Sequence, residues 1–455
     1  MAKYQQYAEY KDSGVEWLGE VPSDWDVVKI KHLSSVKRGA SPRPIDDPKF
    51  FDDYGDYAWV RIADVSASDM YLLNTTQTMS ALGSSLSVKL EPNELFLSIA
   101  GTVGKPCINK IKACIHDGFV YFPDLKIPNK YLFYIFAGEQ AYKGLGKMGT
   151  QLNLNTDTVG DIKVALPKSK IDVQGIIDFL DHETAKIDSL IEKQQQLIQL
   201  LKEKRQAVIS HAVTKGLNPN VPMKDSGVEW LGEVPEHWQF PRLKQLIQYG
   251  SSISYGIVQP GDALDEGVPF IQTTNISKGS FELEDFQKTS VSIESNYPRS
   301  RLEGGEVILG IRASIGAAFV VPMSFKGVNL SRGIARIIPN NLLRSDFLVW
   351  YFKSNTVDQY WGLSKQGSTF SEVSIETVRE LNVVIPPLDE QETITKYLTD
   401  ESNKFEKLIN FAEKQKLLLL ERRTALISAV VTGKIDVRNW QNPNNNNEAK
   451  TEFSA

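Results

Sequence analysis

Two short stretches, at matching places in the two halves of this chain, carry polar side chains that can bind the edges of nucleic-acid bases. Residues 60–64 are VRIAD, and residues 271–275 are IQTTN. Arg can hold guanine through two hydrogen bonds, and Asn or Gln can hold adenine, each with about 1–3 kcal/mol of discrimination. Residues 101–105 and 312–316, GTVGK and RASIG, also differ between the halves. Similar frameworks with different polar residues indicate two related sites for different base sequences.

Other polar side chains near these stretches suit the sugar–phosphate backbone. Lysines such as Lys37 and Lys105 can hold phosphates and set the register of a protein on DNA without identifying bases. The candidate DNA contacts are Lys37, Arg38, Arg43, Arg61, Asp64, Lys105, Gln151, Asn153, Gln272, Thr274, Asn275, Arg312, Ser314, Lys365, Gln366 and Ser368. For any one of them, an ordinary polar surface side chain is the alternative interpretation.

The distribution of charge matters more here than its sum. The net charge of −5 by itself disfavours binding to a polyanion. However, no acidic residue stands between Asp26 and Asp46 or between Glu306 and Asp346. These two intervals contain Lys29, Lys31, Lys37, Arg38, Arg43, Arg312, Lys326, Arg332, Arg336 and Arg344. Basic stretches on an acidic chain favour one surface that faces DNA or RNA. The alternative is chance clustering on solvated surfaces.

A unit that occurs twice must position these side chains. The segment KDSGVEWLGEVPSDW at 11–25 recurs at 224–238, where only the two residues before the final Trp differ. Further matches join 57–66 to 268–277, 90–105 to 302–317, and 149–167 to 367–386. A repeat of this length indicates duplication of a whole unit, with pseudo-two-fold symmetry, rather than a solenoid. The repeated Trp17, Trp25, Trp230 and Trp238 are expected to be packing anchors, with base stacking as the alternative.

Each copy has a mixed α and β part followed by a long helix. The mixed parts, about 26–167 and 239–386, contain short apolar runs bounded by Gly and Pro, which predict strands. Residues 172–212 lack Pro, and their apolar residues recur at steps of three, four and seven, which predicts one amphipathic helix. Residues 390–431 follow the same pattern. We expect the two helices to pack together as a coiled coil, in preference to core helices of one globular domain.

Missing motifs disfavour several classes of enzyme. The sequence contains no phosphate-binding loop, no His-Glu-x-x-His and no G-x-S-x-G motif. Asp181, Glu183 and Lys186 lie close together, but charges on an amphipathic helix usually form a solvated face rather than a nuclease site. Two cysteines, five scattered histidines and the lack of a signal sequence or long apolar run predict a cytoplasmic protein without structural zinc. This combination favours a recognition or scaffold protein.

These parts resemble the specificity subunit of type I restriction-modification systems over about residues 10–437. The motif WLGEVPxxW stands before each mixed part, and PPLDEQ at 386–391 opens the second long helix. The first helix departs from this pattern. Within PKSKIDVQ at 167–174, only the final Gln174 matches the Glu-Gln of that turn, so the cap is expected to differ there.

The resemblance implies an α+β fold in which two target recognition domains are separated by two long helices, packed as an antiparallel coiled coil with an internal pseudo-two-fold repeat. The implied segments are an N-terminal segment (1–25), target recognition domain 1 (26–170), long helix 1 as central spacer (171–216), a linker with the repeated segment (217–238), target recognition domain 2 (239–388), long helix 2 as distal spacer (389–437) and a disordered tail (438–455). By the symmetry of the repeat, residues 17–25 are expected to dock at the end of the second helix, near 431–437.

The resemblance also implies a function. The chain would be a DNA-specificity subunit without catalysis of its own, and each domain would recognise one half of a bipartite, asymmetric site. The helices would set the spacer and dock two modification subunits, which methylate adenine. The implied docking side chains are Leu190, Leu197, Leu201, Leu408 and Leu419.

The cofactors implied by the resemblance belong to the partner subunits. S-adenosylmethionine, ATP and Mg would act in the modification and restriction subunits, and this chain would bind none of them. The restriction subunits would add ATP-dependent translocation and cleavage. Two alternatives stay open: a coiled-coil scaffold that binds proteins without recognising DNA, and a nuclease with an unrecognised site.

Overall fold

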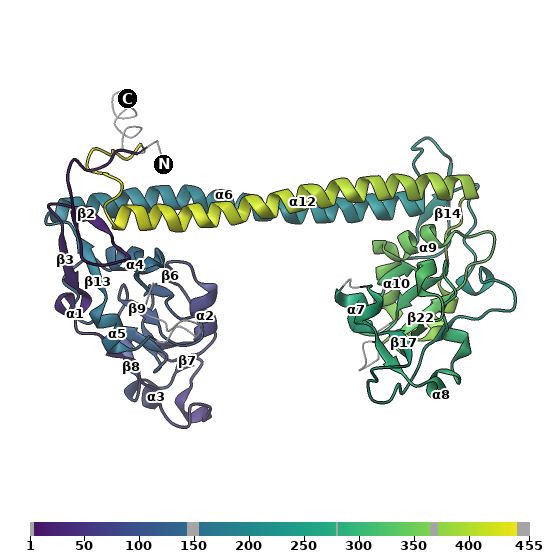
Figure 1. The fold of residues 1–455 in the computed structure, drawn as a ribbon, viewed down its shortest axis with the longest axis horizontal. Helices are drawn as coiled ribbons and strands as arrows, with labels where there is room; N and C mark the ends of the chain where they lie inside the picture. The colour runs from purple at the N-terminus through teal and green to yellow at the C-terminus, as the bar shows by residue number, and fades with distance from the viewer. Residues whose placement is uncertain (1–3, 143–153, 279–280, 365–371, 444–455) are drawn as a thin grey trace. The chain divides into compact units, whose positions relative to one another are not determined.

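The computed structural model describes residues 4–142, 154–278, 281–364 and 372–443 of the chain (Figure 1). The chain forms two compact units: unit 1 contains residues up to 194 and from 414 onward, and unit 2 contains residues 195–413. The boundaries fall inside the long helices α6 (Lys170–Lys215) and α12 (Leu388–Val431), so each helix contributes a segment to each unit. The mixed α and β composition and the two long helices confirm the fold class expected from the sequence.

Unit 1 contains two mixed sheets of short strands. One has the strand order β4 (Lys37–Arg38), β12 (Phe119–Tyr121), β9 (Leu95–Ser98), β10 (Pro106–Asn109) and β6 (Tyr71–Leu72). The other has the order β7 (Thr78–Met79), β5 (Tyr57–Val60), β11 (Ala113–Ile115) and β8 (Val88–Leu90). In the second sheet, β5 and β11 are parallel, with Trp59 opposite Cys114. Their carboxyl ends therefore lie at the same edge.

Short helices and one further strand pair complete the mixed part of unit 1. Strands β3 (Asp26–Lys29) and β13 (Lys163–Leu166) pair in antiparallel fashion and close this part of the chain before α6 begins. The short helices are α1 (Ile30–Leu33), α2 (Ile62–Ala67), α3 (Ala81–Ser85), α4 (Asn129–Ala137) and α5 (Thr156–Asp161).

Unit 2 repeats the central part of this arrangement. One sheet has the order β16 (Ser254–Tyr255), β22 (Ile334–Ile337), β19 (Val307–Gly310) and β20 (Ala318–Val320). The other has the order β18 (Gln287–Thr289), β17 (Val268–Ile271) and β21 (Asn329–Leu330). Strands β17 and β21 are parallel, with Phe270 opposite Asn329, so they correspond to β5 and β11. The helices are α7 (Thr273–Lys278), α8 (Val291–Glu294), α9 (Ser345–Phe352), α10 (Asn355–Ser364) and α11 (Ile375–Glu380).

The long helices pack against each other within each unit (Figure 1). In unit 1, the Arg423 guanidinium donates to the Asp188 carboxylate, with 2.7 Å between Nε and Oδ1. In unit 2, Ile198 and Ile409 share one buried cluster. Residue numbers rise along α6 as they fall along α12, so the pairing is antiparallel, as predicted. Among the described residues, every helix is too short or too polar to cross a membrane.

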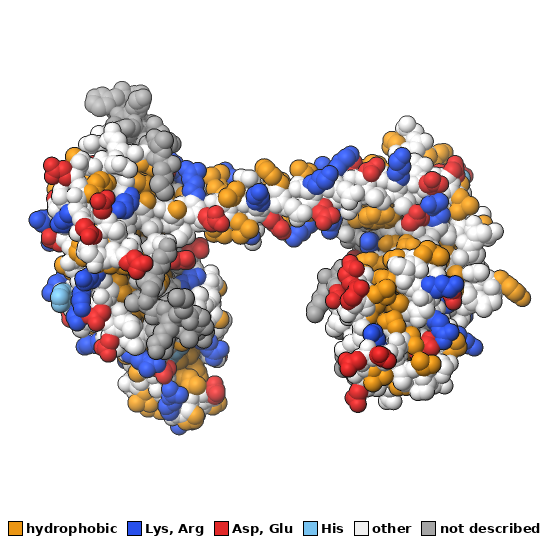
Figure 2. All heavy atoms as spheres, in the orientation of Figure 1, with side chains coloured by type: hydrophobic (Ala, Val, Ile, Leu, Met, Phe, Trp, Pro, Cys, Tyr) orange, Lys and Arg blue, Asp and Glu red, His pale blue; other side chains and the backbone are white. Residues whose placement is uncertain are grey.

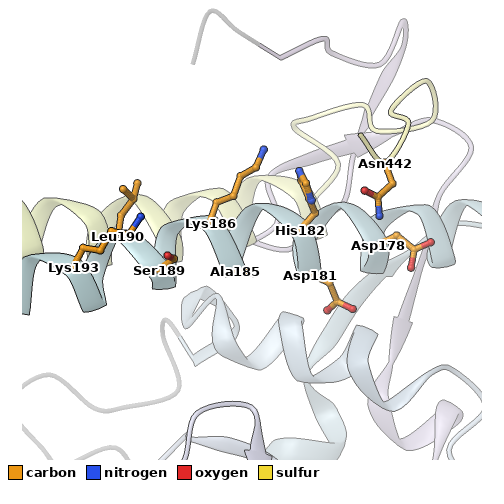
Figure 3. A pocket seen from close by; sticks show the side chains of 9 residues that line it. All are labelled: Asp178, Asp181, His182, Ala185, Lys186, Ser189, Leu190, Lys193 and Asn442. Atoms are coloured by element: carbon orange, nitrogen blue, oxygen red, sulfur yellow. The ribbon is translucent and has the colours of Figure 1, made fainter. Parts of the chain in front are cut away.

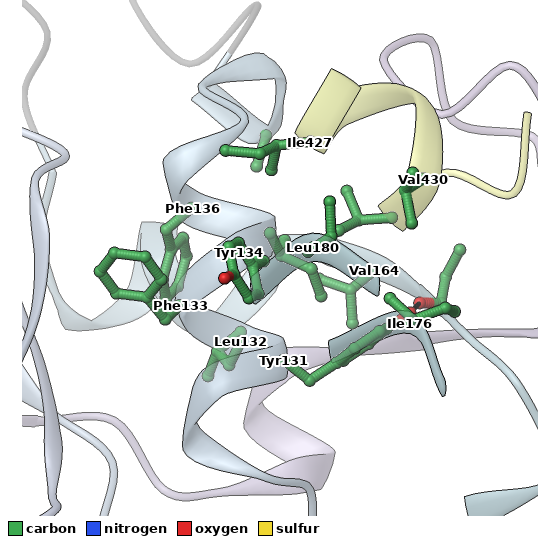
Figure 4. Close-up of a cluster of buried hydrophobic side chains, with 14 of the residues drawn as sticks. Tyr131, Leu132, Phe133, Tyr134, Phe136, Val164, Ile176, Leu180, Ile427 and Val430 are labelled. Atoms are coloured by element: carbon green, nitrogen blue, oxygen red, sulfur yellow. Dashed lines mark hydrogen bonds between the residues drawn. The ribbon is translucent and has the colours of Figure 1, made fainter. Parts of the chain in front are cut away.

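The mixed part of unit 1 is joined to the long helices by α4 (Figure 4). Its sequence, NKYLFYIFA, is almost wholly apolar and aromatic, and every residue from 131 to 136 is buried. These side chains share one core with Leu180 of α6 and Ile427 of α12. The Tyr134 hydroxyl, inside this core, donates to Asp181 Oδ1 at 2.6 Å. Burial of this kind contributes roughly 1.5–3 kcal/mol for each large apolar side chain, so α4 fixes the domain on its helices.

The N-terminal segment docks at the end of α12, which confirms the expectation from the repeat. The Tyr10 hydroxyl donates to the Gly433 carbonyl at 3.0 Å, and the Asp436 amide donates to the Gln5 carbonyl at 2.9 Å. Gly433 has φ 71°, and a Cβ there would lie 2.3 Å from Pro22 Cδ. Only Gly permits both this conformation and this close approach.

The tryptophans of the repeated segments are packing anchors, as predicted. Trp25 is buried in unit 1 and Trp238 in unit 2, and both are at most 1% exposed. Trp17 and Trp230 are partly buried and pack against the same two cores. A base-stacking role is therefore excluded for the two fully buried rings.

The two long helices begin differently, as the sequence comparison suggested. In α12 the Gln391 side chain is fully buried, accepts from the Arg344 amide at 2.9 Å and donates to the Pro386 carbonyl at 2.9 Å. In α6 the Ser169 hydroxyl accepts from the first amides of the helix instead. Gln174 is exposed, and the buried Val173 takes the place of Gln391.

Part of the segment expected to be a disordered tail belongs to the core of unit 1. The Trp440 ring packs edge-on against Phe179, with 5.5 Å between centroids, and lies against His182. Arg438 and Asp436 form an ion pair at 2.6 Å beside it. Trp440 thus lies against α6, and residues 444–455 lie outside the described part of the chain.

Candidate nucleic-acid interface

Three connections meet at the carboxyl end of the parallel strand pair in unit 1. Residues 61–66 follow β5, residues 116–118 follow β11, and residues 99–105 follow β9. A Cβ placed on Gly118 would lie 3.3 Å from the Ala100 side chain, and one placed on Gly101 would lie 2.8 Å from Ile62 Cγ2. The three connections therefore form one continuous surface, which we call the carboxyl-end surface.

Unit 2 has the same surface, formed by residues 272–277, 311–317 and 331–333. A Cβ placed on Gly333 would lie 2.5 Å from Thr273 Cγ2 and 3.4 Å from Arg312 Cβ. A hydroxyl pair ties the short helix to the neighbouring loop in both units: Ser66 with Thr102 at 2.6 Å, and Ser277 with Ser314. The same fold thus presents two versions of one surface.

The backbone of the central loop is nearly the same in both units. Gly101 and Ala313 have φ of 64° and 60°, and Gly104 and Gly316 have φ of 88° and 86°. This match places Ala100, rather than Gly101, opposite Arg312. It agrees with the match of 90–105 to 302–317 and shows that the pairing of 101–105 with 312–316 was shifted by one residue. The left-handed conformation of Ala313 carries a cost of roughly 1–2 kcal/mol that glycine avoids.

Arg61 and Gln272 occupy the same position at the start of α2 and α7. Their backbone amides donate to Asp64 Oδ2 at 2.8 Å and to Asn275 Oδ1 at 2.9 Å. Asp64 and Asn275 therefore act as capping partners of these helices. Asn275 is only 9% exposed, so the structure gives these two candidates a local role in the turn. Thr274 lies exposed on α7 beside this turn.

A glutamine at the start of the neighbouring strand holds the side chain at this position in both units: Gln77 stands just before β7, and Gln287 is the first residue of β18. In unit 1 the Arg61 guanidinium donates to Gln77 Oε1. In unit 2 the Gln272 amide nitrogen donates to Gln287 Oε1 at 3.1 Å. The sequence comparison missed these two glutamines, although they stand in related motifs, QTMS at 77–80 and QKTS at 287–290, whose serines cap the following helices.

Acidic residues hold the basic side chains of both surfaces. In unit 1 the Arg43 guanidinium lies 3.1 Å from Asp117 Oδ2, and Arg38 donates to the Asp117 carbonyl. In unit 2, Arg312 and Arg332 each lie 3.9 Å from one carboxylate oxygen of Glu372. The sequence comparison did not identify Asp117 or Glu372, because neither is near its basic partners along the chain.

The two predicted phosphate contacts of unit 1 are placed differently. The Lys105 ammonium donates to the Ser66 carbonyl at 2.8 Å, and burial lowers the pKa of Lys105. Lys37 is exposed on β4, opposite Tyr121.

The structure brings some of the predicted DNA contacts together. In unit 1, Arg61 and Lys105 lie on the carboxyl-end surface, and Arg38 and Arg43 are joined to it through Asp117. In unit 2, the structure brings together Gln272, Arg312 and Ser314. Five further candidates lie outside the described residues: Gln151, Asn153, Lys365, Gln366 and Ser368.

The predicted docking leucines of the long helices divide into two groups. Leu190, Leu197 and Leu408 are 45%, 44% and 51% exposed. Leu201 and Leu419 are partly buried and pack against the cores of their units. Figure 2 shows hydrophobic side chains between charged ones along the helices. The exposed leucines leave apolar surface that another protein can cover.

The charged residues considered for a nuclease site form ion pairs with neighbouring side chains. A groove along α6 is lined by Asp181 and Lys186, whose side chains point in opposite directions (Figure 3). Asp181 accepts from Lys130 Nζ at 2.5 Å, and Glu183 accepts from Lys186 Nζ at 3.1 Å. Among the described residues, no group of three or more His, Cys, Asp or Glu side chains is arranged to hold a metal ion.

Comparisons with known proteins agree with this arrangement. A family model described as "Type I restriction modification DNA specificity domain" matches residues 22–200 and 235–419. The type I restriction enzyme EcoBI specificity subunit of Escherichia coli is 28% identical over 255 residues, which are 54% of this chain and 53% of that protein. The match thus spans about half of its length.

Two further similarities extend over nearly the whole chain. The putative type I restriction enzyme MjaX specificity subunit of Methanocaldococcus jannaschii is 24% identical, over 92% of this chain and 96% of that protein. One chain of a solved structure, which concerns complex assembly and conformational transition of the type I R-M system, is similar to this chain. The two chains have a TM-score of 0.67 and are 16% identical in sequence. That similarity covers 90% of this chain and 98% of the solved one. It shows the fold.

Proposed function

Because this chain belongs to the family of type I restriction-modification DNA specificity subunits, we propose that it recognises a bipartite, asymmetric DNA site for such a system. Each unit recognises one half of the site through its carboxyl-end surface, and the bases between the halves are not contacted. The observation that carries the proposal is one backbone shape with two sets of polar side chains. Two unlike half-sites require that combination, because side chains rather than the scaffold identify bases.

The long helices set the distance between the two half-sites and dock the modification subunits. In support, α6 and α12 each run through both units without a break, and each carries exposed leucines. The modification subunits, two per chain, bind S-adenosylmethionine and methylate adenine. Restriction subunits add ATP- and Mg-dependent translocation and cleavage. This chain contributes recognition and no catalytic group.

The test is the DNA selected by the complex. The chain and its modification subunits are incubated with a library of randomised duplexes at one salt concentration, and the methylated duplexes are sequenced. We expect two short defined sequences separated by an undefined spacer of constant length. The same motif is expected in the genome of a host that carries this chain and is expected to vanish when the chain is deleted. Methylation without sequence preference would contradict the proposal.

The scaffold alternative depends on the same exposed leucines. A scaffold that binds only proteins does not explain why the two carboxyl-end surfaces carry different polar side chains. The library distinguishes the two functions, because a scaffold supports assembly of the complex without selecting any DNA sequence.

A further inference from the structure

We propose that Arg61 and Gln272 contact bases at the equivalent position of the two half-sites, guanine in one and adenine in the other, and that Gln77 and Gln287 position them. This inference rests on the proposed function, because it assigns bases within the DNA site that the two surfaces recognise. It begins from the equivalence of the four residues.

Strand pairing shows that the two glutamines hold the same place. In unit 1 the Trp59 amide, two residues before Arg61, donates to the Gln77 carbonyl at 2.9 Å. In unit 2 Phe270, two residues before Gln272, stands opposite Gln287 in the antiparallel pair β17–β18. A glutamine just before β7 in unit 1 and at the start of β18 in unit 2 therefore stands at the equivalent position, although the side chain that it contacts differs.

Both ends of the contacting residue are fixed. The backbone amide of Arg61 or Gln272 is held by the capping oxygen of Asp64 or Asn275, and the tip of its side chain is held by the glutamine. A free side chain of this length loses about 1.5–2 kcal/mol of rotamer entropy when it is ordered. Holding the side chain before DNA arrives removes part of that loss from the binding step.

The hydrogen-bonding groups that remain free determine the base. Arg has five N–H donors, and the bond to Gln77 leaves donors for the O6 and N7 acceptors of guanine. Gln272 donates one N–H to Gln287, which leaves one N–H and its carbonyl oxygen. One donor beside one acceptor matches N7 and N6 of adenine. The different residues at one position thus predict different bases.

A purely structural role for these contacts accounts for little. Arg61 and Gln287 are exposed and their partners Gln77 and Gln272 are partly buried, so each hydrogen bond adds only about 0.5–1.5 kcal/mol to stability. If the two glutamines instead position Arg61 and Gln272, their substitution is expected to weaken discrimination at one base pair and to leave the free energy of unfolding almost unchanged.

The test exchanges the two residues within the full complex of this chain and its modification subunits. Arg61→Gln is expected to change the preferred base from guanine to adenine at one position of the first half-site. Gln272→Arg is expected to make the reverse change in the second half-site. Discrimination at each position is expected to shift by about 10- to 100-fold in the randomised library at fixed salt.

Lys110→Gln is the control. Lys110 precedes β11, so it lies at the end of that strand opposite to the carboxyl-end surface, and it bonds to Asn93. The substitution is expected to leave both half-sites unchanged.

The positioning role is tested by a double-mutant cycle. Gln77→Leu is expected to weaken discrimination at the Arg61 position by about 3- to 10-fold, and to have no further effect in an Arg61→Ala background. Gln287→Leu is expected to do the same at the Gln272 position. Equal effects of Gln77→Leu in both backgrounds would overturn the positioning role.

The outcomes separate this inference from the proposed function. If the wild-type complex selects no sequence, the proposed function is wrong. If it selects a bipartite site that Arg61→Gln and Gln272→Arg both leave unchanged, the base assignment is wrong and the proposed function stands. A change spread over many positions, or one in the half-site of the other unit, would likewise contradict the assignment.

Discussion

The carboxyl-end surfaces of unit 1 and unit 2 have the same backbone but opposite charges at one corner. Asp117 of unit 1 stands two residues after β11, and Arg332 of unit 2 stands two residues after the equivalent strand β21. The acid of unit 1 holds Arg43, whereas the base of unit 2 shares Glu372 with Arg312. The residue at this corner can therefore be acidic or basic, because the strands β11 and β21 that precede it form in both units.

The comparison separates residues that build the surface from residues that give it specificity. The turn at Arg61 or Gln272, the left-handed backbone at Gly101 or Ala313 and the hydroxyl pair at Ser66 or Ser277 occur in both units. The side chains that project from this frame differ. A scaffold that tolerates such differences can change one half-site without disturbing the other.

The largest effect is expected when one whole surface is exchanged. Replacing residues 26–167 with the matching domain of another specificity subunit is expected to abolish recognition of the first half-site, a loss on the order of 10³-fold or more in discrimination. The second half-site is expected to stay the same. Mapping methylated adenines in DNA treated with the chimeric complex checks this, and replacing residues 239–386 provides the reciprocal control. If both half-sites change together, the two surfaces do not act independently.

The next effect concerns the shared backbone of the central loop. Gly101→Ala is expected to destabilise unit 1 by about 1–2 kcal/mol, because φ is 64° and the new Cβ would lie 2.8 Å from Ile62 Cγ2. Ala313→Gly is expected to be neutral or stabilising by up to about 1 kcal/mol, because it relieves the left-handed Ala in unit 2. Denaturant unfolding measures both.

A control for these glycine changes lies on α6. Gly175 has open space around its Cβ position, so Gly175→Ala is expected to stabilise the helix by about 0.5–1 kcal/mol. If Gly101→Ala were equally stabilising, the two central loops would not share one backbone shape.

A smaller effect is expected from the acids that hold the basic side chains. Asp117→Asn releases Arg43 from an acidic partner, and Glu372→Gln releases Arg312 and Arg332. We expect each to raise affinity for DNA of any sequence by about 2- to 5-fold and to steepen its dependence on salt, because released arginines can neutralise phosphates. Titrations of DNA at several salt concentrations measure this. A change in the preferred bases would show instead that the acids take part in recognition.

The smallest effect is expected from the conservative substitution of Asp64. Asp64→Asn keeps an oxygen that can accept from the Arg61 amide, so stability is expected to change by less than about 0.5 kcal/mol. The first half-site is expected to stay the same, since Asp64 serves the turn. Asp64→Ala removes the acceptor and is expected to destabilise by about 0.5–2 kcal/mol. A new base preference in the Asn variant would restore Asp64 as a base contact.

The sequence by itself determined the duplicated plan of the molecule. The repeated segments and the recurrence of apolar residues in 172–212 and 390–431 predict two similar domains and two long helices, because a helix follows from a local pattern. The symmetry of the repeat also predicted that the N-terminal segment docks at the end of α12, which Tyr10 and Gly433 confirm. Trp25 and Trp238 were predicted as packing anchors because their whole context is duplicated.

Only the tertiary structure decided which polar side chains share the carboxyl-end surface. Strand pairing brings Gln77 to Arg61 and Asp117 to Arg43, and the register of short strands depends on contacts with distant residues rather than on local sequence. The backbone conformation of Gly101 and Ala313 also decided between two sequence alignments of the central loops, in favour of 90–105 with 302–317 over 101–105 with 312–316. Burial of Asn275 and its bond to the Gln272 amide show that this predicted base contact also caps the start of α7, because a buried polar group needs a hydrogen-bond partner within the fold.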